Sequence, residues 1–229
     1  MIKTLIVPCA TKNTNVEFAY NKDTYSINCV NAIKGINLKE FDEIWYIILD
    51  DMDNKYHISA KIKTDIRRMF PLLYDKVHFC ALPEMTVSPA ETVYKALMLL
   101  KRFGDQKRSI MIKDADNTCN IKQEISGNSV LVASLEDMDI VDPMHKSYVK
   151  LDEQGFITNI IEKRVLSDRF VAGGYLFDDM DDYISAYEKL NNDNESFYIS
   201  DIIFWLILNT NIQFRPIEAM NFIDFNLNK

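Results

Sequence analysis

The segment SIMIKDADN, residues 109–117, decides the fold that this sequence predicts. Its first five residues form a short apolar run, which is typical of a strand buried on both faces of a sheet. The run ends directly in the acidic residues Asp114 and Asp116. Because ligands in open α/β sheets bind outside the carboxyl ends of the parallel strands, we expect this pair to lie at a ligand site.

Upstream of this segment, strand-like and helix-like stretches alternate at the rhythm of βαβ units. Ser88 is a candidate N-cap, with a proline next to it and Glu91 three residues further on, which predicts the start of a helix. Such alternation implies a parallel sheet with helices on both faces. The strands are expected over 2–8, 43–49, 76–82 and 109–113, and the helices over 24–37, 57–70 and 89–103.

Downstream of residue 128 the pattern changes to strand-like segments joined by short turns, which favours partly antiparallel pairing. No repeat, low-complexity tract or linker rich in Pro, Gly and Ser separates the two halves. We therefore expect one α/β domain over residues 1–229, with a Rossmann-like, mixed, mostly parallel sheet flanked by helices on both faces. The expected strands are 128–135, 145–152, 155–163, 171–177 and 214–225, with helices over 179–190 and 198–209.

Composition narrows the class of protein. The net charge of -8 leaves no basic surplus to neutralise a polynucleotide backbone, so we expect no nucleic-acid partner. The four cysteines lie far apart without a C-x-x-C motif, which favours reduced thiols in a cytoplasmic protein. The longest apolar run, 202–208, is too short for a membrane span, and the first ten residues do not have the pattern of a signal peptide.

The pair Asp114 and Asp116 predicts a metal site. Two carboxylates that leave a strand together supply the hard oxygen ligands that suit Mg²⁺ or Mn²⁺ when the ion also bridges nucleotide phosphates. A solvated turn is the competing interpretation, since Asp and Asn are common turn residues. A second acidic group, Asp51 and Asp53, follows the strand over 43–49 but lies further from the expected centre of the sheet.

The order of four motifs resembles that of sugar-phosphate nucleotidyltransferases, which have a GT-A-like nucleotide-binding fold. The motifs are SPAET at 88–92, IMIKDADN at 110–117, IIEKR at 160–164 and VAGGYLF at 171–177. The resemblance covers roughly residues 1–225. It implies that the partners are a nucleoside triphosphate and a sugar phosphate, that Mg²⁺ or Mn²⁺ is the cofactor, and that the product is a nucleotide-activated sugar for surface polysaccharide synthesis.

The resemblance also implies roles for particular residues. Lys163 would meet the acceptor phosphate, and Lys12 would face the leaving pyrophosphate. The metal ligands would be Asp114, Asp116 and Asp224. Nucleotide contacts are expected at Pro8, Cys9, Ala10, Ser88, Ala90 and Glu91, and acceptor contacts at Glu162, Gly173 and Gly174.

One part of the chain departs from this family. The family begins with a glycine-rich loop that carries an arginine and wraps the triphosphate, whereas residues 8–15 read PCATKNTN, with neither glycine nor arginine. Lys12 or Lys22 would have to supply the positive charge, and Asn residues replace glycine only partly. Two alternatives therefore stay open: a GT-A-type glycosyltransferase that uses a nucleotide-sugar, and a non-catalytic regulatory homologue. Assembly into a homo-oligomer also stays open.

Overall fold

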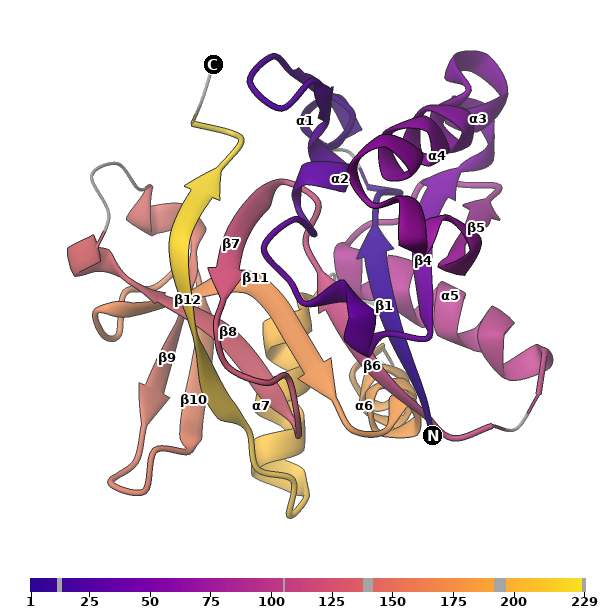
Figure 1. Cartoon of the computed structure of the whole chain (residues 1–229). Coiled ribbons are helices and arrows are strands. Elements are labelled where there is room, and N and C mark those ends of the chain that lie inside the picture. Colours follow the sequence, from indigo (N-terminus) through magenta and orange to yellow (C-terminus); the bar gives the residue numbers. More distant parts are fainter. Residues whose placement is uncertain (12–13, 105, 138–141, 192–196, 228–229) are drawn as a thin grey trace.

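The computed structural model of the chain describes residues 1–11, 14–104, 106–137, 142–191 and 197–227. In the described residues a ten-stranded sheet runs in the order β5-β4-β1-β6-β11-β8-β12-β7, with β9 paired to β11 and β10 paired to β9 (Figure 1). The first half pairs in parallel, through β1 Ile2–Pro8, β4 Glu43–Leu49, β5 Val77–Leu82 and β6 Arg108–Lys113.

The second half of the sheet is mixed. Strand β11 is antiparallel to both β6 and β8, while β12 is parallel to β8 and antiparallel to β7. Its strands are β7 Asn117–Ile121, β8 Ser129–Ser134, β9 Ser147–Leu151, β10 Ile157–Glu162, β11 Arg169–Phe177 and β12 Arg215–Asp224. A separate small hairpin consists of β2 Tyr20–Asn21 and β3 Ser26–Ile27.

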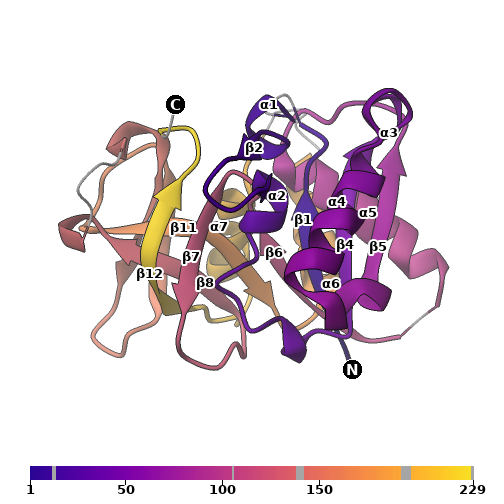
Figure 2. The same ribbon diagram turned by 45° about the horizontal axis from the view of Figure 1, so that its top comes forward.

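Helices cover both faces of the sheet (Figure 2). One face packs against α2 Asn28–Asn31 and α4 Ile58–Met69, and the other against α5 Pro89–Arg102, α6 Met180–Leu190 and α7 Ile199–Asn209. The remaining helices are α1 Thr14–Glu17 and α3 Asp50–Tyr56, with 3₁₀ turns at Leu38–Glu40, Pro71–Lys76, Leu135–Asp137 and Pro143–His145.

Alternation along β1 divides the core between the two faces. Leu5 and Val7 belong to the apolar cluster under α2 and α4, whereas Ile6 belongs to the cluster under α5, α6 and α7. Successive side chains of a strand point to opposite faces, so an uninterrupted apolar run is what a sheet covered on both sides requires. The mixed sheet with helices on both faces, expected from the sequence, is confirmed.

Helices α1 and α3 and the hairpin β2–β3 were not expected, and two further elements, α2 and β7, differ for reasons that the structure shows. The helix expected over 24–37 is reduced to the single turn of α2, because the preceding residues are held in a hairpin: the Ile27 N–H donates to Asp65 Oδ2 over 2.9 Å, and the Ser26 hydroxyl donates to Asn31 Oδ1 over 2.8 Å. Strand β7 was not expected, since its sequence NTCNI lacks apolar alternation, and its pairing with β12 defines it.

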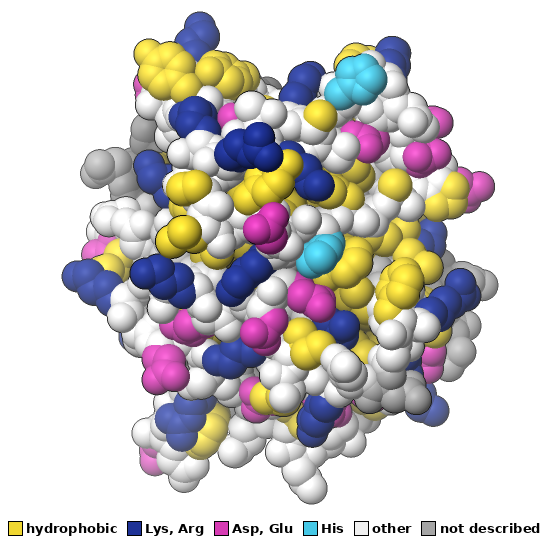
Figure 3. Space-filling model, turned by 45° about the vertical axis from the view of Figure 1, so that its right-hand side comes forward, with side chains coloured by type: hydrophobic (Ala, Val, Ile, Leu, Met, Phe, Trp, Pro, Cys, Tyr) yellow, Lys and Arg dark blue, Asp and Glu magenta, His cyan; other side chains and the backbone are white. Residues whose placement is uncertain are grey.

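The face of the molecule shown in Figure 3 carries charges of both signs. On the face shown in Figure 3, lysine and arginine side chains are interspersed with acidic and apolar ones, and no continuous basic track crosses it.

None of the helices in the described part of the chain has the length and apolar character that crossing a membrane requires.

Candidate active site

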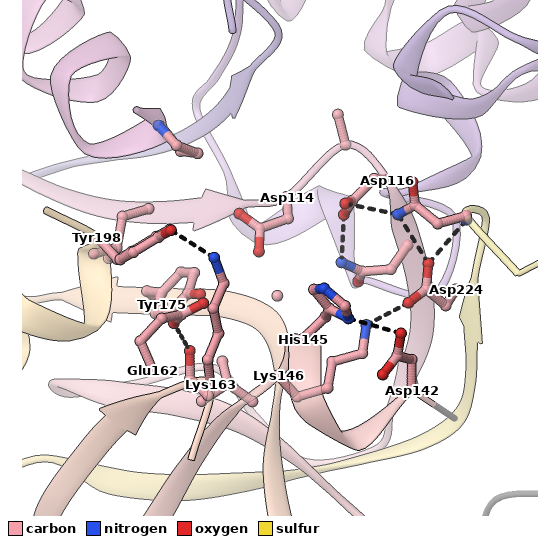
Figure 4. Close-up of a pocket in the computed structure, with 18 of the residues that line it drawn as sticks. Asp114, Asp116, Asp142, His145, Lys146, Glu162, Lys163, Tyr175, Tyr198 and Asp224 are labelled. Atoms are coloured by element: carbon pink, nitrogen blue, oxygen red, sulfur yellow. Dashed lines mark hydrogen bonds and ion pairs between the residues drawn. The ribbon is translucent and has the colours of Figure 1, made fainter. Parts of the chain in front are cut away.

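A cavity of about 560 Å³ opens at the carboxyl ends of β1 and β6. Segments from both halves of the chain form its wall, as Figure 4 shows. Pro8, Pro89 and residues 114–117 come from the first half. The other half contributes residues that include His145, Lys146, Glu162, Lys163, Gly173, Tyr198 and Asp224. The position is the one predicted for a ligand site in an open α/β sheet.

A buried lysine shapes the acidic turn after β6. The Lys113 side chain is fully buried, and its Nζ donates to Asp114 O at 3.0 Å, to Asn117 O at 3.1 Å and to Asn117 Oδ1 at 2.6 Å. Burial lowers the pKa of Lys113. These three oxygens satisfy the three donors of the ammonium, so Lys113 fixes the backbone of the turn from its buried side. The carboxylates of the turn are therefore directed toward the cavity.

The two acids of this turn differ in their surroundings. Asp116 accepts from Asn117 Nδ2 at 2.9 Å and from Asn226 Nδ2 at 3.1 Å. In the described residues the Asp114 carboxylate has no hydrogen-bond donor, and it lines the cavity. Burial, followed by the negative charge of Asp116, raises the pKa of Asp114 to about 7. A buried carboxylate beside a second one is a site that a cation would stabilise.

A third acid lies just behind this pair. Glu17 in α1 is buried, and its Oε2 has no hydrogen-bond partner in the described structure. Burial, with further contributions from the charges of Asp116 and Asp114, raises the pKa of Glu17 well above the usual value, against a hydrogen bond with the Thr11 side chain that lowers it. Helix α1 and the acidic turn are therefore electrostatically coupled.

The third predicted metal ligand, Asp224, is already occupied by other groups. Its Oδ2 accepts from Lys146 Nζ, and its Oδ1 accepts from the backbone N–H of Asn226 at 2.9 Å and from Asn226 Nδ2 at 3.0 Å. Burial raises the pKa of Asp224, but Lys146 and Asn226 outweigh burial, so the pKa is lowered. Across the described residues, no group of three or more His, Cys, Asp and Glu side chains could hold a metal ion.

The donor set nevertheless fits one divalent cation. Mg²⁺ is usually held by one or two carboxylates together with substrate phosphates and water, rather than by a full cage of protein ligands. Asp114, with its open carboxylate, and Asp116 beside it satisfy that requirement. Asp224 is paired with the Lys146 ammonium and accepts three hydrogen bonds, whereas Asp116 accepts two, both from neutral amides, so the role of Asp224 as a metal ligand stays a prediction.

The two glycines predicted to contact the acceptor are in different places. Gly173 lines the cavity with a φ of 68°, and its carbonyl accepts from the Asp114 N–H at 2.8 Å. A Cβ at this position would lie 2.4 Å from Asn117 Nδ2 and 2.9 Å from Asp114 Oδ2. Gly174 faces the core, where a Cβ would lie 2.3 Å from Leu131 Cδ1. Gly173 is thus a neighbour of the acidic turn, and Gly174 is a packing residue.

Lys163 lies on the opposite wall from Asp114 (Figure 4). Its Nζ donates to the Tyr198 hydroxyl at 2.8 Å and lies 4.9 Å from the centroid of that ring. The hydrogen bond with Tyr198 raises the pKa of Lys163, so the side chain stays cationic. The backbone is in the left-handed region with a φ of 55°, and its N–H donates to Lys146 O at 2.9 Å. An uncommon conformation therefore directs this ammonium into the cavity.

Hydroxyl groups orient the neighbouring Glu162. Its Oε2 accepts from the Ser147 hydroxyl and from the Ser200 hydroxyl, the latter at 3.2 Å. His145 lies on the same side of the cavity, where its Nδ1 is 2.7 Å from Asp142 Oδ2. This wall combines charged and hydroxyl groups around a space that suits a polar, phosphorylated ligand.

Several residues expected to contact the nucleotide lie behind the wall. Cys9 and Ala10 are buried, and the Ala10 carbonyl accepts from the Thr86 N–H. Ser88 and Ala90 are buried as well; Ser88 Oγ caps α5 by accepting from the Glu91 N–H at 3.3 Å, and the Ala90 carbonyl accepts from the Tyr183 hydroxyl at 3.0 Å.

Pro8 and Pro89 are the members of these two segments that line the cavity. Glu91 makes an ion pair with Lys95 over 2.8 Å and accepts from the Val87 N–H over 2.7 Å. Lys12, the predicted partner of the pyrophosphate, lies outside the described residues.

Sequence reasoning missed part of the wall. Lys146, Tyr198, His145 and Asn226 were not singled out as site residues, although all four line the cavity. No local motif marks them. His145 and Lys146 lie at the end of a 3₁₀ turn, Tyr198 precedes α7 and Asn226 follows β12, and these segments meet the acidic turn only after folding. Asn226 alone had a usable signal, since it lies two residues after the predicted ligand Asp224.

Comparison with solved structures places this fold. No family model matches the sequence, and no curated protein matches it. A nucleoside-diphosphate-sugar pyrophosphorylase from Vibrio cholerae RC9 superposes with a TM-score of 0.69 at 17% identity, covering 96% of this chain and 94% of its own. An inositol-1-phosphate CTP transferase from T. maritima superposes with a TM-score of 0.68 at 10% identity, covering 97% and 87%.

A UDP-glucose pyrophosphorylase complexed with UDP-glucose gives a TM-score of 0.68 at 13% identity, covering 96% of this chain and 92% of its own. Two of the three are pyrophosphorylases and one is a CTP transferase, and each matches this chain over nearly its full length. The chain therefore has the fold of sugar-phosphate nucleotidyltransferases, as the order of its motifs predicted.

Proposed function

We propose that this chain is a metal-dependent nucleotidyltransferase, which joins a nucleoside triphosphate to a sugar phosphate and releases pyrophosphate. The observation that supports this best is the geometry of the cavity. The open carboxylate of Asp114 and the ammonium of Lys163 face the same space from opposite walls, at the edge of the sheet where α/β proteins bind ligands. Structures with this fold include nucleotide-sugar pyrophosphorylases.

Asp114 and Asp116 would hold the Mg²⁺ or Mn²⁺ ion, and the phosphates of the nucleotide would complete its ligands. A bound ion offsets negative charge on the phosphoryl oxygens as the nucleotidyl group is transferred. The buried Lys113 keeps the turn in place from behind, and the carbonyl of Gly173 fixes its first residue.

Lys163 would bind the phosphate of the acceptor. Its ammonium is a compact charge on a flexible stem, which suits a phosphate that must be held without fixed bidentate geometry. A phosphate oxygen of the acceptor then attacks the α-phosphorus of the nucleotide. The new P–O bond forms as the bond from that phosphorus to the β-phosphate oxygen breaks, and pyrophosphate leaves with the electron pair.

Glu162 would contact the body of the acceptor. Ser147 and Ser200 orient its carboxylate from within the wall, so that it could accept a hydrogen bond from a sugar hydroxyl. Such a reaction makes a nucleotide-activated sugar, which is a donor for glycosyl transfer. The proposed role is therefore a cytoplasmic step of polysaccharide biosynthesis.

The direct test is a screen of the four common ribonucleoside triphosphates and dTTP against sugar 1-phosphates, with Mg²⁺ present and pyrophosphate release as the signal. We expect release for at least one pair, and expect Asp114→Asn to abolish it while thermal unfolding stays within a few degrees of the wild type, because acids facing a cavity contribute little to stability. Release that persists in Asp114→Asn would remove the assignment of the site.

The N-terminal segment favours testing a second candidate in parallel. Neither Cys9 nor Ala10 reaches the cavity, and the described part of this segment, residues 8–11, offers no basic side chain for a leaving pyrophosphate. A glycosyltransferase, whose donor keeps both phosphates on the metal, would not need one. Stabilisation by a nucleoside diphosphate or nucleotide-sugar, without pyrophosphate release from any pair, would favour that function.

A further inference from the structure

Lys146 is fixed at the edge of the acidic turn by contacts on two sides. Its Nζ forms an ion pair with Asp224 Oδ2, and it also lies 5.0 Å from the centroid of the Phe222 ring. The side chains of Lys146 and Asp224 are only 13% and 8% exposed. The pair is therefore shielded from water. Charge–charge contacts in such a shielded place are much stronger than on an open surface. Lys146 nevertheless lines the cavity.

Asp224 is the most heavily occupied of the three acids, because it accepts three hydrogen bonds and one of its donors is an ammonium. Lys146 takes Oδ2, while the backbone N–H and the side-chain amide of Asn226 both take Oδ1. The same side-chain amide of Asn226 also donates a hydrogen bond to Asp116 Oδ2 at 3.1 Å. One chain of hydrogen bonds thus joins the ammonium of Lys146 to the acidic turn. The carboxylate of Asp114 stays outside this chain, facing the cavity.

The charge balance of the cavity points the same way. The acidic turn with Asp224 brings three carboxylates together, and Lys146 neutralises one of them within the described wall. Its positive charge also reaches Asp114, whose ionised form it favours. A single divalent cation at Asp114 and Asp116, together with this ammonium, would place positive charge on two sides of a bound phosphoryl group.

From these contacts we propose that Lys146 is a second cation of the site, and that Asp224 anchors this ammonium instead of binding a metal ion. The role of Lys146 in the reaction rests on the proposed function. The pairing of Lys146 with Asp224, and its effect on metal binding, do not. Once held by Asp224, the ammonium keeps two N–H donors that can point to a non-bridging oxygen of a phosphoryl group. It donates hydrogen bonds throughout and transfers no proton.

Direct metal binding tests the proposal without any turnover. The full chain is titrated with Mn²⁺ alone, and free Mn²⁺ is followed by electron paramagnetic resonance. We expect Asp114→Asn to weaken Mn²⁺ binding by about tenfold or more, the scale on which metal sites respond to lost partners. We expect Asp224→Asn, and the double variant Asp224→Asn with Lys146→Met, to stay within about twofold of the wild type.

The double variant guards against misfolding, because it removes both members of the buried pair and leaves no unpaired charge. If it, or Asp224→Asn with unchanged thermal unfolding, loses as much Mn²⁺ affinity as Asp114→Asn, then Asp224 is a metal ligand and the proposal is overturned. A wild-type chain that does not bind Mn²⁺ at millimolar concentration overturns it as well.

Turnover provides the second arm. With the nucleotide and acceptor found by the pyrophosphate screen, Lys146→Met should lower kcat by about tenfold or more and change the acceptor KM by less than about threefold, since the charge is needed mainly during transfer. Lys150→Met, at an exposed lysine of β9, the strand that begins directly after Lys146, is the matched control and should leave both constants unchanged.

An unaltered kcat in Lys146→Met makes the lysine a structural partner of Asp224 only, which overturns the proposal. If no nucleotide and acceptor pair reacts while the Mn²⁺ pattern holds, the proposed function fails but the assignment of Asp224 as the anchor of an ammonium stands. The two failures are therefore distinguishable.

Discussion

At the scale of single residues, Lys163 carries the sharpest kinetic prediction. Lys163→Ala should lower kcat/KM through a raised acceptor KM, because a charge-assisted bond to phosphate is lost. The loss of transition-state stabilisation should be about 1.5–3 kcal/mol. Nucleotide affinity should hardly change, since the lysine lies on the wall opposite Asp114. Lys163→Arg should recover only part of the loss. Steady-state kinetics with acceptor varied at saturating nucleotide would measure this, and an unchanged acceptor KM in Lys163→Ala would show that the lysine does not touch the acceptor.

Gly173 gives a second prediction at the same scale. In Gly173→Ala the new Cβ would overlap Asn117 Nδ2 and Asp114 Oδ2, so the acidic turn must shift and Mn²⁺ affinity should fall by about tenfold or more. Gly155→Ala is the matched control: it also has a positive φ, but a Cβ there has open space around it. Both variants should lose about 1–2 kcal/mol of stability from the left-handed backbone. Equal Mn²⁺ affinity in the two variants would contradict the predicted displacement.

At the scale of elements, the burial of Glu17 in α1 leads us to expect that stability depends on pH. Its raised pKa means that the folded chain holds this proton more tightly than the unfolded chain. Stability from this group is therefore full below the unfolded pKa and is lost as pH rises toward the folded pKa. Glu17→Gln cannot ionise, so it should raise Tm at about pH 8 more than at about pH 5. Thermal unfolding at both pH values tests this, and a Tm gain that is larger at the lower pH would contradict it.

The elements also show what a sequence can predict. Strands β1, β4 and β6 were expected almost to the residue, because sheets covered on both faces require uninterrupted apolar runs, and the motif Ser88-Pro89 marked the start of α5. The short α2 and the polar β7 could not be predicted from the sequence, because contacts with distant residues define them. Asp65 holds the segment before α2, and β12 pairs with β7. The same limit applies to the cavity: its acids follow a strand and are visible in the sequence, whereas Lys146 and Tyr198 arrive from elements that no spacing connects to β6.

At the scale of the whole molecule, strand β11 joins the two halves of the sheet. It pairs with β6 of the parallel half and with β8 and β9 of the mixed half, and the apolar cluster on each face includes residues of both halves. We therefore expect one unfolding transition over residues 1–229, with equal calorimetric and van't Hoff enthalpies. Differential scanning calorimetry measures both, and two resolved transitions would show that the halves are separate domains.

The first turn of α7 has a practical consequence for spectroscopy. Tyr198 and Ile199 form part of the cavity wall, and the same helix carries Trp205, one of the two tryptophans of the chain. The other, Trp45, lies in β4 and is stacked on His78. A Trp45→Phe variant would leave a single indole on the helix that meets the ligand. Its emission wavelength would then follow any movement of α7 when the cavity fills, so the chain contains its own optical reporter of occupancy, without an added label.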